Sequence, residues 1–275
     1  MIALFVLKLA AGVTMLWWLM PRKDVTDGFF RIQMRVLLGL VVLCALLLSA
    51  GQTWTPKQIT DTTTAADIGV GSLRLTGDSV YVAWWIRTIA IAVAVIAYAG
   101  SIFWALGRRL PGNLCIHLVT LLCVAALGLH AINVPNECSM PQQILSDFSS
   151  AALIGGVLTG MLLGHWYLTT PTMSINPLWW FNAAILTASG LRLVASVWAL
   201  AVNGVTLQDS SHMIWFGIRW TGGVITPILM TIMVWRILKH RNTQSATGVL
   251  FAGLVVVFMG EMAAALLERD TLIPY

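Results

Sequence analysis

Eight long apolar stretches divide this chain almost from end to end. They cover residues 2–20, 29–50, 81–106, 113–134, 148–168, 177–202, 213–237 and 246–267. A helix needs about 20 apolar residues to cross the hydrocarbon of a bilayer, where a helix satisfies its own backbone hydrogen bonds. Only 10% of the residues are charged, against about 25% in soluble domains. The sequence therefore predicts an all-α, polytopic integral membrane helical bundle of about eight transmembrane helices, with residues 1–275 forming a single transmembrane domain.

The basic residues are distributed unevenly between the two sets of loops that connect these stretches. If the N-terminus lies outside, the inner loops and adjoining helix ends hold Arg22, Lys23, Arg31, Arg35, Arg108, Arg109, Arg236, Lys239 and Arg241. The outer segments then hold only Lys57, Arg74 and Arg269. Because Lys and Arg are retained on the cytoplasmic side, we expect the N-terminus and the C-terminus to lie outside a bacterial inner (cytoplasmic) membrane.

This distribution also explains the net charge of +5 without a polyanionic partner. The expected partners are the lipid bilayer and other membrane or periplasmic subunits, and nucleic acid is not among them. The one sizeable segment outside the apolar stretches is 51–80, for which we expect an ordered outer loop with a small hairpin over residues 69–80.

The stretch from Asp147 to Pro171 carries three glycines at a spacing of four, namely Gly156, Gly160 and Gly164. Glycines four apart share one helix face and let a neighbouring backbone or a flat cofactor come close. The stripe is typical of a helix-packing seam, and the alternative is a slot for a cofactor. In either case we expect this helix at the centre of the fold, with the first two spans packed peripherally.

Four ionisable residues fall at membrane depth in the predicted outer half, where such groups are costly and mark functional sites. They are Arg87, Arg192, Arg219 and Glu261. Three positive charges facing one negative charge would form a polar pocket that favours an anionic group. The alternative is that each arginine pairs with Glu261, with a backbone carbonyl or with a lipid headgroup.

Four histidines form two pairs at matching depths. His117 and His165 lie near the inner ends of consecutive spans, and His130 and His212 lie near the outer surface. Neutral imidazole binds haem iron well, so His117 and His165 are candidate iron ligands of a haem b placed against the glycine stripe. His130 and His212 are candidate ligands of an outer haem, whose propionates would lie near the arginines. His117 and His130 are 13 residues apart, which turns a helix by about 220° and points them to different faces. A structural or interfacial role is the alternative for each histidine.

No motif of soluble enzyme chemistry is present. The sequence contains no Walker A loop, HExxH or GxSxG motif, and none of its four cysteines forms a CxxC pair. We therefore assign no catalytic residue and leave open whether the protein is an enzyme.

Three functions are compatible with this pattern. The first is a membrane subunit of an electron-transfer complex, of respiratory or photosynthetic type, that binds haem b, a quinone or both. The second is a transporter for an anionic substrate held by Arg192 and Arg219, against which the absence of a recognisable inverted repeat counts. The third is a non-catalytic scaffold or assembly subunit of a membrane complex.

Overall fold

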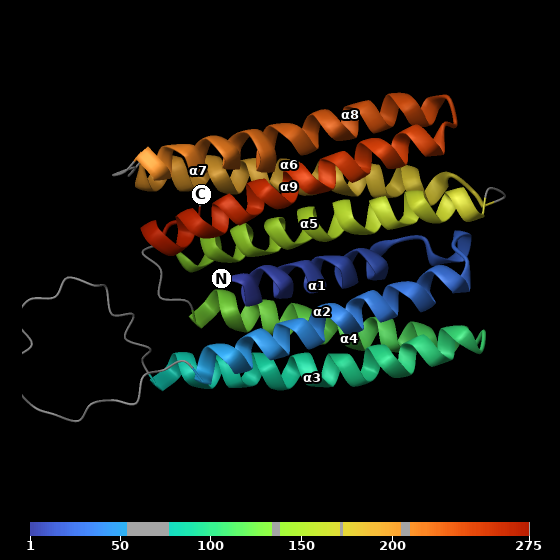
Figure 1. Ribbon diagram of the computed structural model, residues 1–275, viewed down its shortest axis with the longest axis horizontal. Helices are drawn as coiled ribbons and strands as arrows, with labels where there is room; N and C mark the ends of the chain where they lie inside the picture. The colour runs from blue at the N-terminus through green and yellow to red at the C-terminus, as the bar shows by residue number, and fades with distance from the viewer. Residues whose placement is uncertain (54–76, 134–137, 171–172, 205–209, 275) are drawn as a thin grey trace, which may run out of the picture.

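The computed structural model describes residues 1–53, 77–133, 138–170, 173–204 and 210–274, and these residues are helical with no strand among them (Figure 1). The elements are α1 Ile2–Leu19, η1 Arg22–Asp24, α2 Asp27–Thr53, α3 Gly77–Ala105, α4 Arg109–Asn133, α5 Met140–Thr169, α6 Asn176–Asn203, α7 Ser210–Trp220, η2 Thr221–Ile225, α8 Thr226–Lys239 and α9 Thr243–Thr271.

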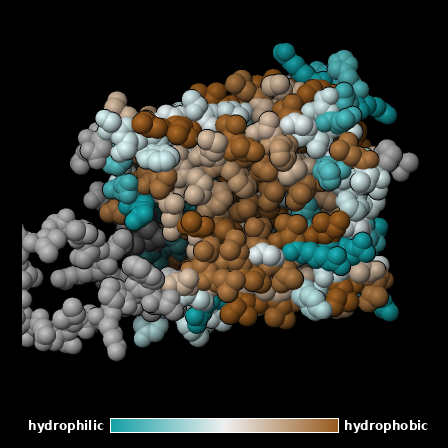
Figure 2. Space-filling model, viewed as in Figure 1, coloured by the Kyte–Doolittle hydropathy of each residue, from teal (hydrophilic) through white to brown (hydrophobic). Residues whose placement is uncertain are grey.

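Eight of the helical segments in the described residues are long and apolar enough to cross a membrane, as predicted. One of them, Ser210–Lys239, is made of α7, the π-helical turn η2 and α8. Figure 2 shows brown, hydrophobic side chains over the middle of one face and hydrophilic ones gathered towards its two ends. Both chain termini lie towards the same end of the bundle, which we call the terminus end (Figure 1). The side of the membrane that this end faces stays a prediction.

Local sequence sets the ends of several helices. Pro141 and Pro177 occupy the first turns of α5 and α6, where a missing backbone N–H costs nothing. Asn242 caps α9 by accepting a hydrogen bond from the backbone N–H of Ser245 at 3.0 Å. Gly107 adopts a φ of 67° in the turn between α3 and α4, a conformation that favours glycine.

The spans form two groups of four with the same pattern of neighbours. In the first group, α1 packs on α2 and α4, and α3 packs on α2 and α4. In the second group, α5 packs on α6 and α9, and α8 packs on the same two helices. The groups meet mainly where α1 lies along α5, and both of these helices start at the terminus end (Figure 1).

The helix α5 is central, as expected, because it packs on α1, α4, α6 and α9. The expectation that the first span is peripheral is wrong, since α1 lies between α5 and the rest of the first group. The closest approach of α1 and α5 involves Gly12 and Gly155. A Cβ atom built on Gly12 would overlap the carbonyl oxygen of Ala151, and one built on Gly155 would overlap the backbone of Gly12. The backbones of the two groups are therefore in direct contact.

The predicted outer loop 51–80 is shorter in the structure. The helix α2 continues to Thr53 and α3 begins at Gly77, so residues 77–80 are helical and do not form part of a hairpin. The remainder of that loop, residues 54–76, lies outside the described residues.

Candidate functional site

Three of the four residues predicted for the polar pocket meet inside the second group. The Oε1 atom of Glu261 on α9 lies 3.1 Å from Arg192 Nε on α6 and 3.1 Å from Arg219 Nη1 on α7. The other carboxylate oxygen accepts a hydrogen bond of 2.6 Å from the hydroxyl of Ser150 on α5. We call Arg192, Arg219 and Glu261 the arginine cluster. All three are at most 3% exposed, so neither arginine reaches the surface of the protein.

Serine side chains also accept hydrogen bonds from the two guanidinium groups. Arg192 Nη1 donates to Ser146 Oγ at 2.7 Å, and Arg219 Nη2 donates to Ser196 Oγ at 2.7 Å. Burying a charge is costly unless the charge is paired and its remaining donors are satisfied. The serines of α5 and α6 therefore belong to the same site as the charges.

The π-helical turn η2, Thr221–Ile225, makes room for Arg219. Its wider turn is closed by the backbone N–H of Thr226, which donates to the carbonyl oxygen of Thr221, and Thr226 Oγ1 donates to the same oxygen at 2.7 Å. A Cβ atom built on Gly223 would overlap Arg219 Nη1 and lie 3.3 Å from Glu261 Oε1. Single π-turns inside helices are frequent at functional sites. Here the turn places a residue without a side chain beside the guanidinium.

We expect Gly223→Ala to destabilise the protein by about 1–3 kcal/mol, the range for overpacking a filled interior. The added methyl would displace the guanidinium of Arg219 from Glu261. Thermal unfolding in detergent, followed by tryptophan fluorescence, measures the change. The matched control is Gly217→Ala, because a Cβ atom at Gly217 has no neighbour within 4 Å. Equal unfolding midpoints for the two variants would contradict this role of Gly223.

A second set of buried charges lies between the two groups, nearer the terminus end. Lys8 Nζ on α1 lies 2.8 Å from Asp147 Oδ1 on α5 and 3.8 Å from Glu268 Oε2 on α9. The amide of Gln143 donates to Asp147 Oδ1 at 3.2 Å and to Glu268 Oε1 at 2.8 Å. His130 Nδ1 on α4 lies 3.4 Å from Asp147 Oδ2. We call Lys8, Asp147 and Glu268 the lysine cluster.

A small cavity of about 10 Å³ joins the two clusters. Its polar lining consists of Lys8, Ser150, Arg192, Glu261 and Glu268. This volume is close to the smallest that holds one water molecule, and the lining offers more than the two to four polar partners that such a water needs. Across both clusters three basic side chains are balanced by three acidic ones. The excess of positive charge expected from the sequence is therefore absent once Lys8, Asp147 and Glu268 are counted.

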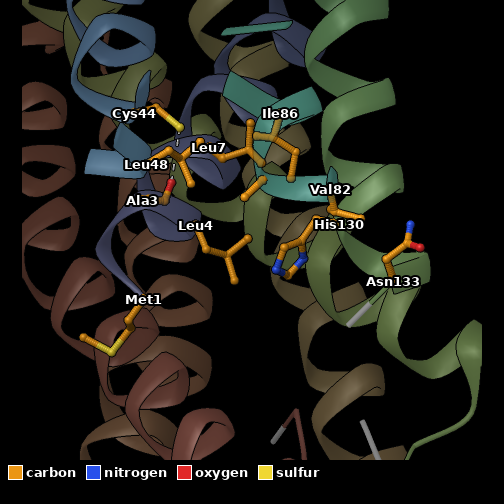
Figure 3. Close-up of a pocket in the computed structure, with 11 residues that line it drawn as sticks. Met1, Ala3, Leu4, Leu7, Cys44, Leu48, Val82, Ile86, His130 and Asn133 are labelled. Atoms are coloured by element: carbon orange, nitrogen blue, oxygen red, sulfur yellow. Dashed lines mark hydrogen bonds between the residues drawn. The ribbon is translucent and has the colours of Figure 1, made fainter. Parts of the chain in front are cut away.

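A groove of about 260 Å³ lies at the terminus end of the first group, between α1, α2, α3 and α4 (Figure 3). Most of its lining is aliphatic, including Leu4, Leu7, Leu48, Val82 and Ile86. His130 and Asn133 of α4 supply polar side chains to one wall (Figure 3). The same His130 that contacts Asp147 therefore also faces this apolar space.

The remaining predicted site residues are placed as follows. His117 and His165 are both exposed, and the ring of His117 packs edge-on against Trp18 at 6.5 Å. Arg87 is half-buried on α3, which packs on α2 and α4 and does not reach the arginine cluster. His212 on α7 lies 3.6 Å from Asp270 at the end of α9.

The glycine stripe of α5 is filled by side chains of neighbouring helices. A Cβ atom on Gly156 would lie 3.1 Å from Leu16 and 3.2 Å from Ile185. One on Gly160 would also lie 3.2 Å from Ile185, and one on Gly164 would overlap the hydroxyl of Thr247. The stripe thus acts as a packing seam with α1, α6 and α9. Among the described residues, no group of three or more His, Cys, Asp or Glu side chains is arranged to hold a metal ion.

The site contains residues that sequence reasoning missed. The predicted apolar stretches begin at 148 and end at 267 and so leave Asp147 and Glu268 outside the spans, whereas α5 runs from Met140 and α9 runs to Thr271. Two spacings could have revealed them. Gln143 and Asp147 are four residues apart, and Glu261 and Glu268 are seven apart, so each pair shares a helix face.

No known family model, curated protein or solved structure matches this chain.

Proposed function

We propose that the protein is a membrane subunit of an electron-transfer complex and that the groove at its terminus end binds a quinone. The observation that carries this proposal is the position of His130, which lines an apolar groove and lies 3.4 Å from a fully buried carboxylate, Asp147. A quinone combines an apolar ring and tail with two carbonyl oxygens. The aliphatic lining suits the ring, and the imidazole offers the hydrogen bond.

The protonation of His130 suits both redox states of such a ligand. With one proton on Nδ1, the imidazole donates to Asp147 and its Nε2 atom accepts a hydrogen bond from a hydroquinone hydroxyl. With a second proton on Nε2, it donates to a quinone carbonyl. A carboxylate behind the ring fixes which nitrogen faces the ligand.

The haem part of the hypothesis gains no support, because the glycine stripe is filled and both predicted iron ligands are exposed. Anion transport would require Arg192 and Arg219 to release Glu261. A scaffold role needs neither the groove nor the buried charges. The quinone site uses the groove and the buried carboxylate of Asp147, and for this reason we prefer it.

Binding of a short-chain quinone to the purified protein tests the proposal. We expect decylubiquinone to bind the detergent-solubilised protein, as measured by calorimetry. We expect His130→Leu to weaken binding about tenfold, since leucine removes the hydrogen bond, which is worth about 0.5–1.5 kcal/mol. His212→Leu is the matched control, because His212 is also paired with a carboxylate near the terminus end but does not line the groove. Absence of binding to the wild type, or equal binding by the His130 variant, would refute the quinone site.

A further inference from the structure

We propose that His130 exchanges protons with water at the terminus end through Asp147, Lys8 and Glu268. This route rests on the proposed function only for the nature of the proton donor, a hydroquinone in the groove. The path itself follows from contacts among four side chains on four different helices, α4, α5, α1 and α9.

The side chains form an ordered series from the groove to the surface. His130 Nδ1 lies 3.4 Å from Asp147 Oδ2, and Asp147 Oδ1 lies 2.8 Å from Lys8 Nζ. Side-chain exposure is 0% for Asp147, 7% for Lys8 and 14% for Glu268. The series therefore passes through a fully buried carboxylate and ends at a carboxylate that meets water near the end of α9.

Proton transfer from Lys8 to Glu268 needs a bridging water molecule. Their charged atoms are 3.8 Å apart, which is too long for a direct hydrogen bond. The small cavity of about 10 Å³ is lined by both residues and has room for one water molecule. Gln143 holds the two carboxylates in place by donating to both of them, so the distance between them is fixed from α5.

One proton moves from His130 to water without a net change in the charge of the intervening side chains. A proton taken up by His130 passes from Nδ1 to Asp147, which becomes neutral. Lys8 gives one proton through the bridging water to Glu268 and takes the proton from Asp147. Glu268 then releases a proton to water. At the end one proton has left His130, and Asp147, Lys8 and Glu268 have returned to their starting charges.

A ligand in the groove would make this route necessary. The side chain of His130 is 19% exposed and faces the groove, so an occupied groove covers the imidazole and closes its direct contact with water. Asp147 is then the polar group that remains within reach of Nδ1. Arg192 and Arg219 are not on the route, because guanidinium groups do not release protons in proteins. Glu261 is only 3% exposed and therefore does not lead to the surface.

The test measures proton exchange at His130 with the groove closed and needs no quinone. The groove is filled by the substitution Ala83→Trp, since Ala83 lines it on α3. In this background the Nδ1–H of His130 is observed by NMR with 15N-labelled histidine, assigned by its loss in His130→Gln, and its exchange with water is measured by magnetisation transfer. We expect Glu268→Gln to slow the exchange at least about tenfold, equivalent to about 1.4 kcal/mol of added barrier.

Lys8→Arg provides a second variant that keeps the charge and the ion pair. Because guanidinium does not give up a proton, we expect the same slowing in a folded protein. Asp270→Asn is the control, since Asp270 is an exposed acid beside Glu268 on the same helix end and is not on the route. Exchange at the parent rate in both Glu268→Gln and Lys8→Arg would overturn the route. If exchange slowed in these variants but the protein bound no quinone, only the proposed function would be overturned. If the protein bound quinone but exchange was unchanged in both variants, only the route would be overturned.

Discussion

Replacing Glu261 with glutamine is expected to lower the free energy of unfolding by about 3–5 kcal/mol, the usual cost of removing one partner from a buried ion pair. Glu261 is the shared partner of Arg192 and Arg219, and all three side chains are buried. The glutamine keeps the shape of the side chain and leaves two guanidinium charges facing a neutral amide. Thermal unfolding of the detergent-solubilised protein, followed by the fluorescence of its tryptophans, measures the loss.

A second substitution makes this prediction specific to charge. Arg219→Gln alone removes a buried hydrogen-bonded group and should destabilise the protein. In the Glu261→Gln background the same change removes one of two unbalanced charges and should restore part of the lost stability. Asp270→Asn, at a side chain that is 49% exposed, should change the stability by no more than about 0.5 kcal/mol. If Arg219→Gln destabilised both backgrounds equally, the two residues would not be coupled as the structure shows.

Gly12→Ala is expected to destabilise the protein by about 3 kcal/mol or more, at the upper end of overpacking costs. The added Cβ would overlap the carbonyl oxygen of Ala151 and lie 3.2 Å from the Cα of Gly155. These are backbone atoms of α5, which cannot rotate away as a side chain can, so α1 and α5 must separate. Lys8 lies one turn before Gly12 and would move away from Asp147 with the helix.

Replacing a glycine with alanine at a position with free space should not lower the stability. A Cβ atom at Gly190 of α6 has no neighbour within 4 Å, and alanine is better than glycine in a helix by up to about 1 kcal/mol. Gly190→Ala should therefore leave the unfolding midpoint unchanged or raise it, while Gly12→Ala lowers it. A midpoint for Gly12→Ala at or above that of the wild type would show that the contact between α1 and α5 is looser than described.

The sequence predicts the number and nature of the spans because a run of apolar residues is a local property. Which residues come within hydrogen-bond distance depends on how the helices rotate and pack, and this is only partly visible in a sequence. Arg192, Arg219 and Glu261 could be chosen because charges at membrane depth are rare and need partners. Lys8 interrupts the first apolar run and is not among the predicted site residues, since its partner Asp147 is 139 positions away in the sequence.

The glycines of α5 also show what a sequence pattern can and cannot predict about helix packing. The spacing of Gly156, Gly160 and Gly164 correctly indicates a face that packs closely against neighbours. The backbone contact with α1 is made instead by Gly155, which is one residue and about 100° away on the helix. The spacing of the glycines identifies one face of a helix. Which single residue touches the partner backbone depends on where the partner helix crosses, and this cannot be deduced from the spacing.

The repeated arrangement of α1–α4 and α5–α9 has a consequence for how such a chain can arise. A unit that crosses the bilayer an even number of times returns to the side from which it started. A tandem fusion of two such units therefore inserts both in the same orientation, without any change in the basic loops that direct insertion. In this chain the first group holds an apolar groove, and the second group encloses paired charges.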